Sequence, residues 1–267
     1  MKKYFSVLRI CFINRLQYRA AALGGVATQF AWGFMSILGF LAFYRINPDN
    51  FSMSFSQTVS YIWLQQAFLA LFYAFFFESS IFSSITDGNI AYDTVRPIDL
   101  YTRWFFQSIG IRLSSALLRC IPILLVAFIL PEPFRMSLPS SPFHLLLFLL
   151  SVSLSLCVII AILQFVYISV IYTLSPTGIR IMSIVLIEFL SGGIIPIPFF
   201  PEPFRTIAEF LPFGAVQNIP LRIYNGNISG FEIVEKMGLQ IAWIVVLVFL
   251  GKLFMRKALR KVIVQGG

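Results

Sequence analysis

Three charged residues lie well inside, and not at the ends of, apolar stretches that are long enough to cross a membrane: Arg112, Arg119 and Glu188. An isolated charge at mid-bilayer depth is costly, so each of these residues is expected to have a partner. Arg112 lies near the start of its stretch, and its long side chain is expected to extend toward the cytoplasmic headgroups. Arg119 and Glu188 both lie near mid-depth, and we predict that they form an ion pair. Such a pair either belongs to a translocation path or fixes helix packing, and the sequence leaves both alternatives open.

Residue patterns typical of enzymes and metal sites are absent from the sequence. His144 is the only histidine, which excludes a site built from several histidines. The three cysteines are Cys11, Cys120 and Cys157. They lack the spacing of metal ligands and are interpreted as packing residues. The only Gly-Lys pair, at 251–252, has valine where a phosphate-binding loop needs its first glycine. We therefore predict a chain that is not an enzyme and holds no metal or cofactor of its own; an intramembrane enzyme is the weakest alternative.

The composition decides which class of protein must position these residues. Of 267 residues, 58% are hydrophobic and only 12% are charged, and the mean hydropathy is +0.87. A soluble fold could not cover so much apolar surface, so the composition excludes a soluble enzyme and predicts an all-α polytopic membrane protein. The net charge of +9 is attributed to basic residues that flank membrane helices, and no nucleic-acid partner is expected.

Six stretches have about the 20 apolar residues that a bilayer core requires. They are 21–44, 57–77, 104–130, 143–173, 178–199 and 238–255. If the N-terminus is cytoplasmic, 13 Lys and Arg residues lie on the cytoplasmic side and 5 on the other. Basic residues concentrate on the cytoplasmic side of membrane proteins, so both termini are predicted to be cytoplasmic.

Two segments on the predicted cytoplasmic side are not predicted to span the membrane. Residues 1–19 mix basic and bulky apolar side chains, which favours a helix lying in the membrane interface over an extension of the first span. Residues 78–103 contain the turn signals Asp87-Gly88-Asn89 and Arg96-Pro97. The apolar residues around these turns include Ile85, Ile90 and Val95. They favour short helices that present a docking face over a solvated loop.

On the opposite side, residues 191–220 contain six prolines yet stay apolar. Prolines at this density break a helix repeatedly, and irregular backbone at membrane depth must be buried in protein or line a wet cavity. We predict that 200–220 forms a re-entrant helical hairpin. Glu202, Arg205 and Glu209 recur at helical spacing on its first arm, and Pro212 to Gly214 is the expected bend.

Four sequence strings together resemble the permease subunits of type-2 ABC transporters. They are "SITDGNIAYDTVRPIDLYTRWFF", "IPIPFFPEPFRTIAEFLPF", "NIPLRIYNGNIS" and the C-terminal "VQGG". The last string is similar to one subgroup that pairs with a second, different permease. The resemblance covers nearly the whole chain, and none of the strings is a catalytic fingerprint.

The resemblance implies an ATP-driven exporter in a bacterial inner membrane. Such permeases form homo- or heterodimers and bind two separate ATPase subunits, which hold the ATP and Mg²⁺. By resemblance, Asp87, Gly88, Asn89, Arg96 and Pro97 fall in the coupling region that contacts the ATPase, and the re-entrant hairpin closes the pathway outside. A self-sufficient channel or secondary transporter is the alternative. The Phe-rich spans suggest an amphipathic or lipid-like cargo.

Overall fold

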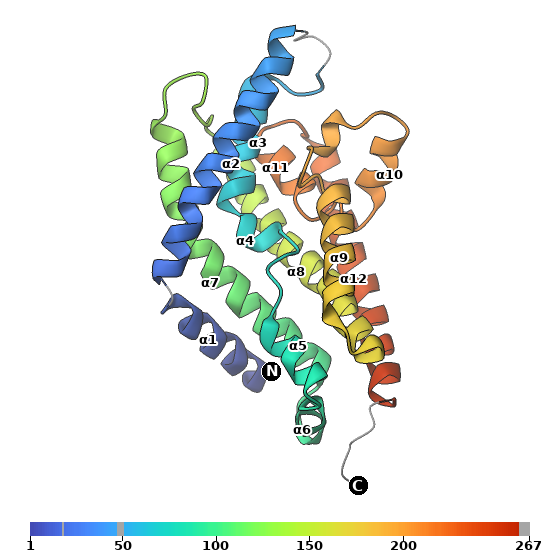
Figure 1. Cartoon of the computed structure of the whole chain (residues 1–267). Coiled ribbons are helices and arrows are strands. Elements are labelled where there is room, and N and C mark those ends of the chain that lie inside the picture. The colour runs from blue at the N-terminus through green and yellow to red at the C-terminus, as the bar shows by residue number, and fades with distance from the viewer. Residues whose placement is uncertain (18, 47–50, 262–267) are drawn as a thin grey trace.

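The computed structural model describes residues 1–17, 19–46 and 51–261, and this part of the chain is helical without any β-strand (Figure 1). The first seven helices are α1 (Lys2–Leu16), α2 (Arg19–Ile46), α3 (Phe55–Ala67), α4 (Leu69–Phe72), α5 (Ser79–Thr86), α6 (Ile90–Val95) and α7 (Leu100–Ile129). They are followed by α8 (Pro142–Thr173), α9 (Pro176–Leu190), the 3-10 helix η2 (Ile197–Phe199), α10 (Phe204–Phe210), α11 (Asn218–Tyr224) and α12 (Phe231–Leu259).

Within the described residues, four helices are long and apolar enough to cross a bilayer. They are Gly24–Ile46 within α2, and the whole of α7, α8 and α12. All four coincide with predicted spans, which confirms an all-α polytopic membrane protein. Large parts of these helices expose apolar side chains, as expected where lipid rather than water is the solvent.

The two other predicted spans are not continuous helices. Within 57–77 the helix breaks at Phe68, resumes as the single turn α4 and ends at Phe72, after which Tyr73 is extended and residues 74–77 form no helix. Within 178–199 the helix α9 ends at Leu190, and the chain continues through turns to η2. The total of six crossings therefore stays a prediction. The interruptions themselves are the most informative feature of the fold, because they expose backbone groups inside the bundle.

Side-chain caps fix where several helices begin. Ser54 and Gln57 form a reciprocal capping box at the start of α3, and Asp99 accepts a hydrogen bond from the Thr102 N–H at the start of α7. Each cap satisfies backbone N–H groups that a helix leaves unpaired in its first turn. At α8 the cap is Ser141, whose hydroxyl oxygen accepts a hydrogen bond from the backbone N–H of His144. The same hydroxyl lies 2.8 Å from Nδ1 of the His144 ring. The lone histidine therefore has a structural partner in a helix cap.

The first helix packs along the N-terminal half of α7 and does not simply extend α2. At the crossing, a β-carbon on Gly110 would lie 2.6 Å from the carbonyl oxygen of Leu8 and 3.3 Å from Cβ of Cys11. Only glycine allows so close an approach of two backbones. Tyr4 and Phe5 stack against Phe106 on the same face of α7. A separate helix at this place agrees with the predicted helix over 1–19.

The bundle has two distinct ends, and α8 lies at its centre. This helix packs against α7, α9, α11 and α12, and its middle is buried. Figure 1 shows α1, α5, α6 and the C-terminal end of α12 at one end. The opposite end carries α10, α11 and the connection between α7 and α8. The predicted coupling segment and the predicted hairpin thus lie at opposite ends of the molecule.

Candidate functional site

The interruption after α4 is held by one buried cation. Arg112 of α7 is 1% exposed. Its guanidinium donates to the carbonyl oxygens of Leu71 at 2.9 Å, Tyr73 at 3.0 Å and Phe76 at 2.9 Å, with a longer contact to Ala70 at 3.3 Å. A broken helix leaves its last carbonyls without backbone donors, and here a charged side chain supplies them.

The N–H groups of the same stretch have side-chain partners from two other helices. The backbone N–H of Ala74 donates to the carboxylate of Glu188 on α9 at 2.6 Å. The backbone N–H of Glu78 donates to the hydroxyl oxygen of Tyr167 on α8 at 3.0 Å. Residues 73–78 are therefore fixed by α7, α8 and α9 together, although they form no helix of their own.

The interruption after α9 lies against the first one. The carbonyl of Gly193 accepts hydrogen bonds from Gln65 of α3 at 2.8 Å and from the Tyr73 hydroxyl at 2.9 Å. A side chain at Gly193 would collide with the carboxylate of Glu188. The two broken helices thus form one polar centre within an apolar bundle, in which side chains replace the missing helical hydrogen bonds. Discontinuous helices of this kind often mark the functional centre of a transporter.

The segment over 78–103 folds into two short helices joined by a tight turn. Asp87, Gly88 and Asn89 form the exposed turn between α5 and α6, and Gly88 adopts a φ of +75°. A left-handed backbone of this kind favours glycine because other residues carry a β-carbon that is strained there. Arg96 and Pro97 are also exposed, at the end of α6.

The exposed face of this segment is carried by α6. Val95 is 84% and Tyr92 74% exposed, the highest exposures among the apolar residues of α5 and α6. Asp93 anchors the helix, since its carboxylate forms an ion pair with Arg103 of α7 and approaches Arg96 at 3.9 Å. We call Tyr92 and Val95 the α6 face.

Helix α1 is attached to the same region. The Lys3 ammonium donates to the carbonyl of Pro97. The backbone N–H of Asp99 donates to the Tyr4 hydroxyl at 3.1 Å. A force applied at the α6 face would therefore reach both α1 and α7 through direct contacts.

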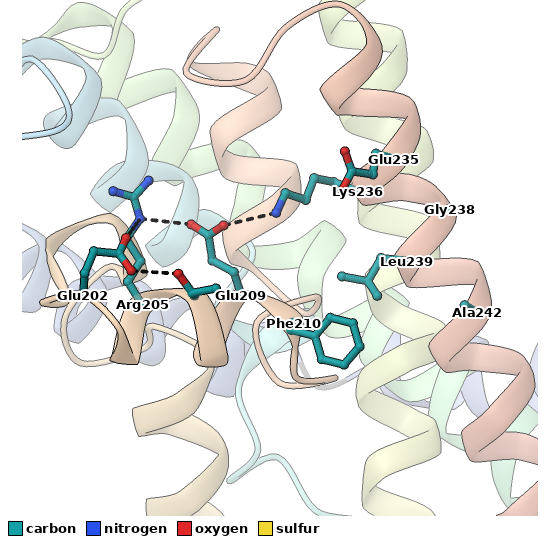
Figure 2. Close-up of a pocket in the computed structure, with 10 residues that line it drawn as sticks. Glu202, Arg205, Glu209, Phe210, Glu235, Lys236, Gly238, Leu239 and Ala242 are labelled. Carbon is teal, nitrogen blue, oxygen red and sulfur yellow. Dashed lines mark hydrogen bonds and ion pairs between the residues drawn. The ribbon is translucent and has the colours of Figure 1, made fainter.

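At the other end of the bundle, Glu209 is the centre of a charge cluster (Figure 2). Its carboxylate pairs with Arg222 at 2.8 Å, Lys236 at 3.1 Å and Arg205 at 3.2 Å. Burial raises the pKa of Glu209, but the charges and hydrogen bonds of these three cations outweigh that effect and hold the pKa below its usual range. The cluster joins α10, α11 and α12 into one unit.

A pocket of about 540 Å³ opens between α10 and α12 beside this cluster (Figure 2). Its charged lining residues are Glu202, Arg205, Glu209, Glu235 and Lys236. Trp243 of α12 donates its ring N–H to the backbone carbonyl of Phe210 at 2.9 Å, and its ring packs edge-on against the Phe210 ring. The pocket is a mixed-charge groove with an apolar wall.

The predicted hairpin is present as two short helices around a turn. Helix α10 ends at Phe210, residues 211–217 form the turn, and α11 begins at Asn218. Pro212 and Gly214 lie in that turn, as predicted. A β-carbon on Gly214 would collide with the carbonyl of Ala208. The first arm is shorter than expected, since the helix begins at Phe204 and not at residue 202. Its depth in the membrane stays a prediction.

One family model matches most of the chain. This model, described as "ABC-2 family transporter protein", covers residues 30–266. The chain belongs to the ABC-2 transporter family. A search of curated proteins gave no match. Family membership together with the four long apolar helices identifies an integral membrane subunit of an ABC transporter.

The predicted ion pair between Arg119 and Glu188 of the ABC-2 chain is wrong. Arg119 lies over the ring of Phe76 at 5.1 Å, whereas Glu188 accepts from the backbone of Ala74. The expectation that Arg112 extends to the headgroups is also wrong, because this side chain is buried and its two terminal nitrogens donate to backbone carbonyls inside the bundle. Both errors have one cause: the prediction treated 57–77 as a regular helix, which would have offered no free backbone groups to Arg112 or Glu188.

Two of the predicted coupling residues of the ABC-2 chain do not face outward. Ile85 and Ile90 are each 3% exposed and pack into the core. The alternation of apolar residues was interpreted as a docking face, but most of it binds α5 and α6 to their own bundle. Of Ile85, Ile90 and Val95, only Val95 belongs to the exposed α6 face.

Several site residues of the ABC-2 chain were missed altogether. Gln65 and Tyr73 lie in the predicted second span, and Arg222 and Lys236 lie beyond the predicted hairpin. For Gln65 a signal existed, since a polar amide within an apolar span is expected to face a partner. For the two cations no local pattern indicates that they converge on Glu209. The C-terminal string at 264–267, on which the subgroup prediction depends, lies outside the described residues.

Proposed function

We propose that this chain is the permease subunit of an ATP-driven exporter and couples to separate ATPase subunits through the α6 face. The observation that carries the proposal is a pair of exposed apolar side chains, Tyr92 and Val95, on a helix that is otherwise firmly anchored. Exposed apolar residues on a fixed element are typical of a protein interface. The sequence lacks a phosphate-binding loop, so ATP and Mg²⁺ would be bound by the partner, in two copies of the ATPase.

A second permease subunit would complete the translocation path. Exposed apolar side chains on α2 (Trp32, Met35 and Phe43) and on α9 (Met182 and Val185) are available for a partner helix or for lipid. The partner is either a second copy of this chain or a different permease. The interrupted helices next to α9 would then form the polar part of the path, and α10 with α11 would close its outer end.

The first experiment tests the docking face by co-purification with the cognate ATPase. Val95→Asp is expected to abolish co-purification and substrate-stimulated ATP hydrolysis while the permease still inserts, because the new charge would be desolvated at the interface. The matched control is Leu138→Asp. Leu138 is 73% exposed but lies at the opposite end, so this variant should retain the ATPase.

Normal ATPase association of the Val95→Asp variant would contradict the proposed docking face. Transport by the purified chain alone in proteoliposomes, driven by an ion gradient, would contradict the need for an external motor and favour a secondary transporter or channel. The two results are independent of each other.

The proposed orientation is tested by single-cysteine labelling in a background without the three native cysteines. Asn89→Cys in the α5–α6 turn is expected to react only from the cytoplasm, and Leu138→Cys only from outside. Both termini are then cytoplasmic, as the Lys and Arg distribution favours. Labelling with the sides exchanged would reverse the topology.

A further inference from the structure

A second cationic centre lies where α1, α2 and α7 meet, and it differs from Arg112 in having no acceptors. Arg119 forms no hydrogen bond or ion pair within the described part of the chain, and its buried Nε atom lacks a partner. Its guanidinium lies over the Phe76 ring at 5.1 Å and against Gly25 of α2, where a β-carbon would come within 3.0 Å of Cζ. A charge at this depth normally has a counter-charge.

A second arginine adds to the unbalanced charge. Arg15, near the end of α1, donates weakly to the Ser115 hydroxyl at 3.4 Å. Ser115 precedes Arg119 by one helical turn on α7, and the two guanidinium groups lie within electrostatic range of each other. The Glu78 carboxylate lies within electrostatic range of Arg15 and Arg112, yet no ion pair joins it to either of them among the described residues. Two like charges within electrostatic range of each other are stabilised by an anion that contacts both.

The surroundings indicate which anion fits. Helix α1 exposes Phe5 at 57%, Ile10 at 58% and Ile13 at 45%, while its Lys2 and Arg9 are exposed as well. Such a helix lies at a membrane interface, with its basic groups at headgroup level. Acyl chains could lie along the apolar residues, while a headgroup phosphate would lie at the level of Arg15. A soluble anion would not use the apolar part of this surface.

The geometry points to a binding site for the phosphate of an anionic phospholipid, formed by Arg15, Ser115 and Arg119. The two arginines supply charge-assisted hydrogen bonds, and the serine hydroxyl, which accepts from Arg15, adds a further donor. An anionic headgroup is preferred over a zwitterionic one because no carboxylate in the site can neutralise a positive headgroup. This site is separate from the α6 face and does not depend on an ATPase.

The test is native mass spectrometry of the purified full-length chain titrated with phosphatidylglycerol or phosphatidylcholine. We expect phosphatidylglycerol to bind at least tenfold more tightly. Arg119→Gln and Arg15→Gln are each expected to weaken its binding about tenfold, which corresponds to about 1.4 kcal/mol. The matched control is Arg9→Gln, which removes the same charge from the exposed surface of α1 and should change binding less than twofold.

Gly25→Ala provides a variant that leaves the charge unchanged. The added methyl group would displace the Arg119 guanidinium, so phosphatidylglycerol binding should weaken although the net charge of the chain is the same. Equal binding of the two lipids would overturn the proposal, and so would an effect of Arg9→Gln as large as that of Arg119→Gln. Displacement of the lipid by an equal concentration of inorganic phosphate would overturn the assignment to a lipid.

Discussion

Replacing Arg112 by methionine should collapse the interrupted helix after α4. Methionine has a similar length and apolar character, so it fills most of the space that the arginine stem occupies. It cannot donate a hydrogen bond. The carbonyl oxygens of Leu71, Tyr73 and Phe76 would then remain buried without their partner, since Arg112 contacts each of them at 2.9–3.0 Å.

The expected loss follows from the number and burial of these contacts. A hydrogen bond from a charged donor contributes about 1.5–3 kcal/mol, and a buried group left unsatisfied costs about 1–3 kcal/mol. The three contacts share one guanidinium and are not additive. The cost of removing the arginine is offset in part because its own desolvation is relieved. We therefore expect a loss of about 3–5 kcal/mol, which is the range for breaking other buried charged contacts.

The assay is thermal unfolding in detergent without added lipid, followed by size-exclusion chromatography. A loss of about 4 kcal/mol corresponds to a decrease in Tm of about 10 °C for a chain of this size. Arg119→Met is the matched control, because it removes the same group from the same face of α7, two turns farther on, where no hydrogen bond is lost. It should lower Tm by only a few degrees. Equal shifts for the two variants would refute the role assigned to Arg112.

Three further changes test the polar centre, the Glu209 cluster and the turn that contains Gly214. Since the pKa of Glu209 is lowered in the folded chain, its contribution to stability is present above the unfolded pKa of about 4.3 and is lost as pH falls through the lower folded value. Acid titration should therefore show a steeper loss for the native chain than for Glu209→Gln, and parallel curves would contradict the cluster. Gly193→Ala should disrupt assembly because the methyl group meets the Glu188 carboxylate; an unchanged elution profile would exclude this close contact. Gly214→Ala should lower the Tm of the chain, since its methyl group meets the Ala208 carbonyl. An unchanged Tm would show that the turn can relax to accept the methyl group.

The sequence alone determined the class of the protein and the identity of its long helices. Apolar composition and the length of hydrophobic runs are averages over many residues, and the bilayer acts on those averages whatever the neighbours are. Local signals also located the turn at Asp87–Asn89 and the turn that contains Pro212 and Gly214, because glycine and proline restrict the backbone at the residue where they occur.

Only the tertiary structure decided which charges meet and which apolar residues are exposed. Arg112 and Glu188 contact backbone groups that are free because residues 73–78 are not helical. No side-chain pattern in that apolar segment indicates the break. Ile85 and Val95 are both branched apolar residues close to a turn signal, yet Ile85 is buried by contacts within the bundle and Val95 is exposed. Hydropathy records how apolar a residue is, whereas burial and pairing depend on groups that are distant in sequence and are brought together only by folding.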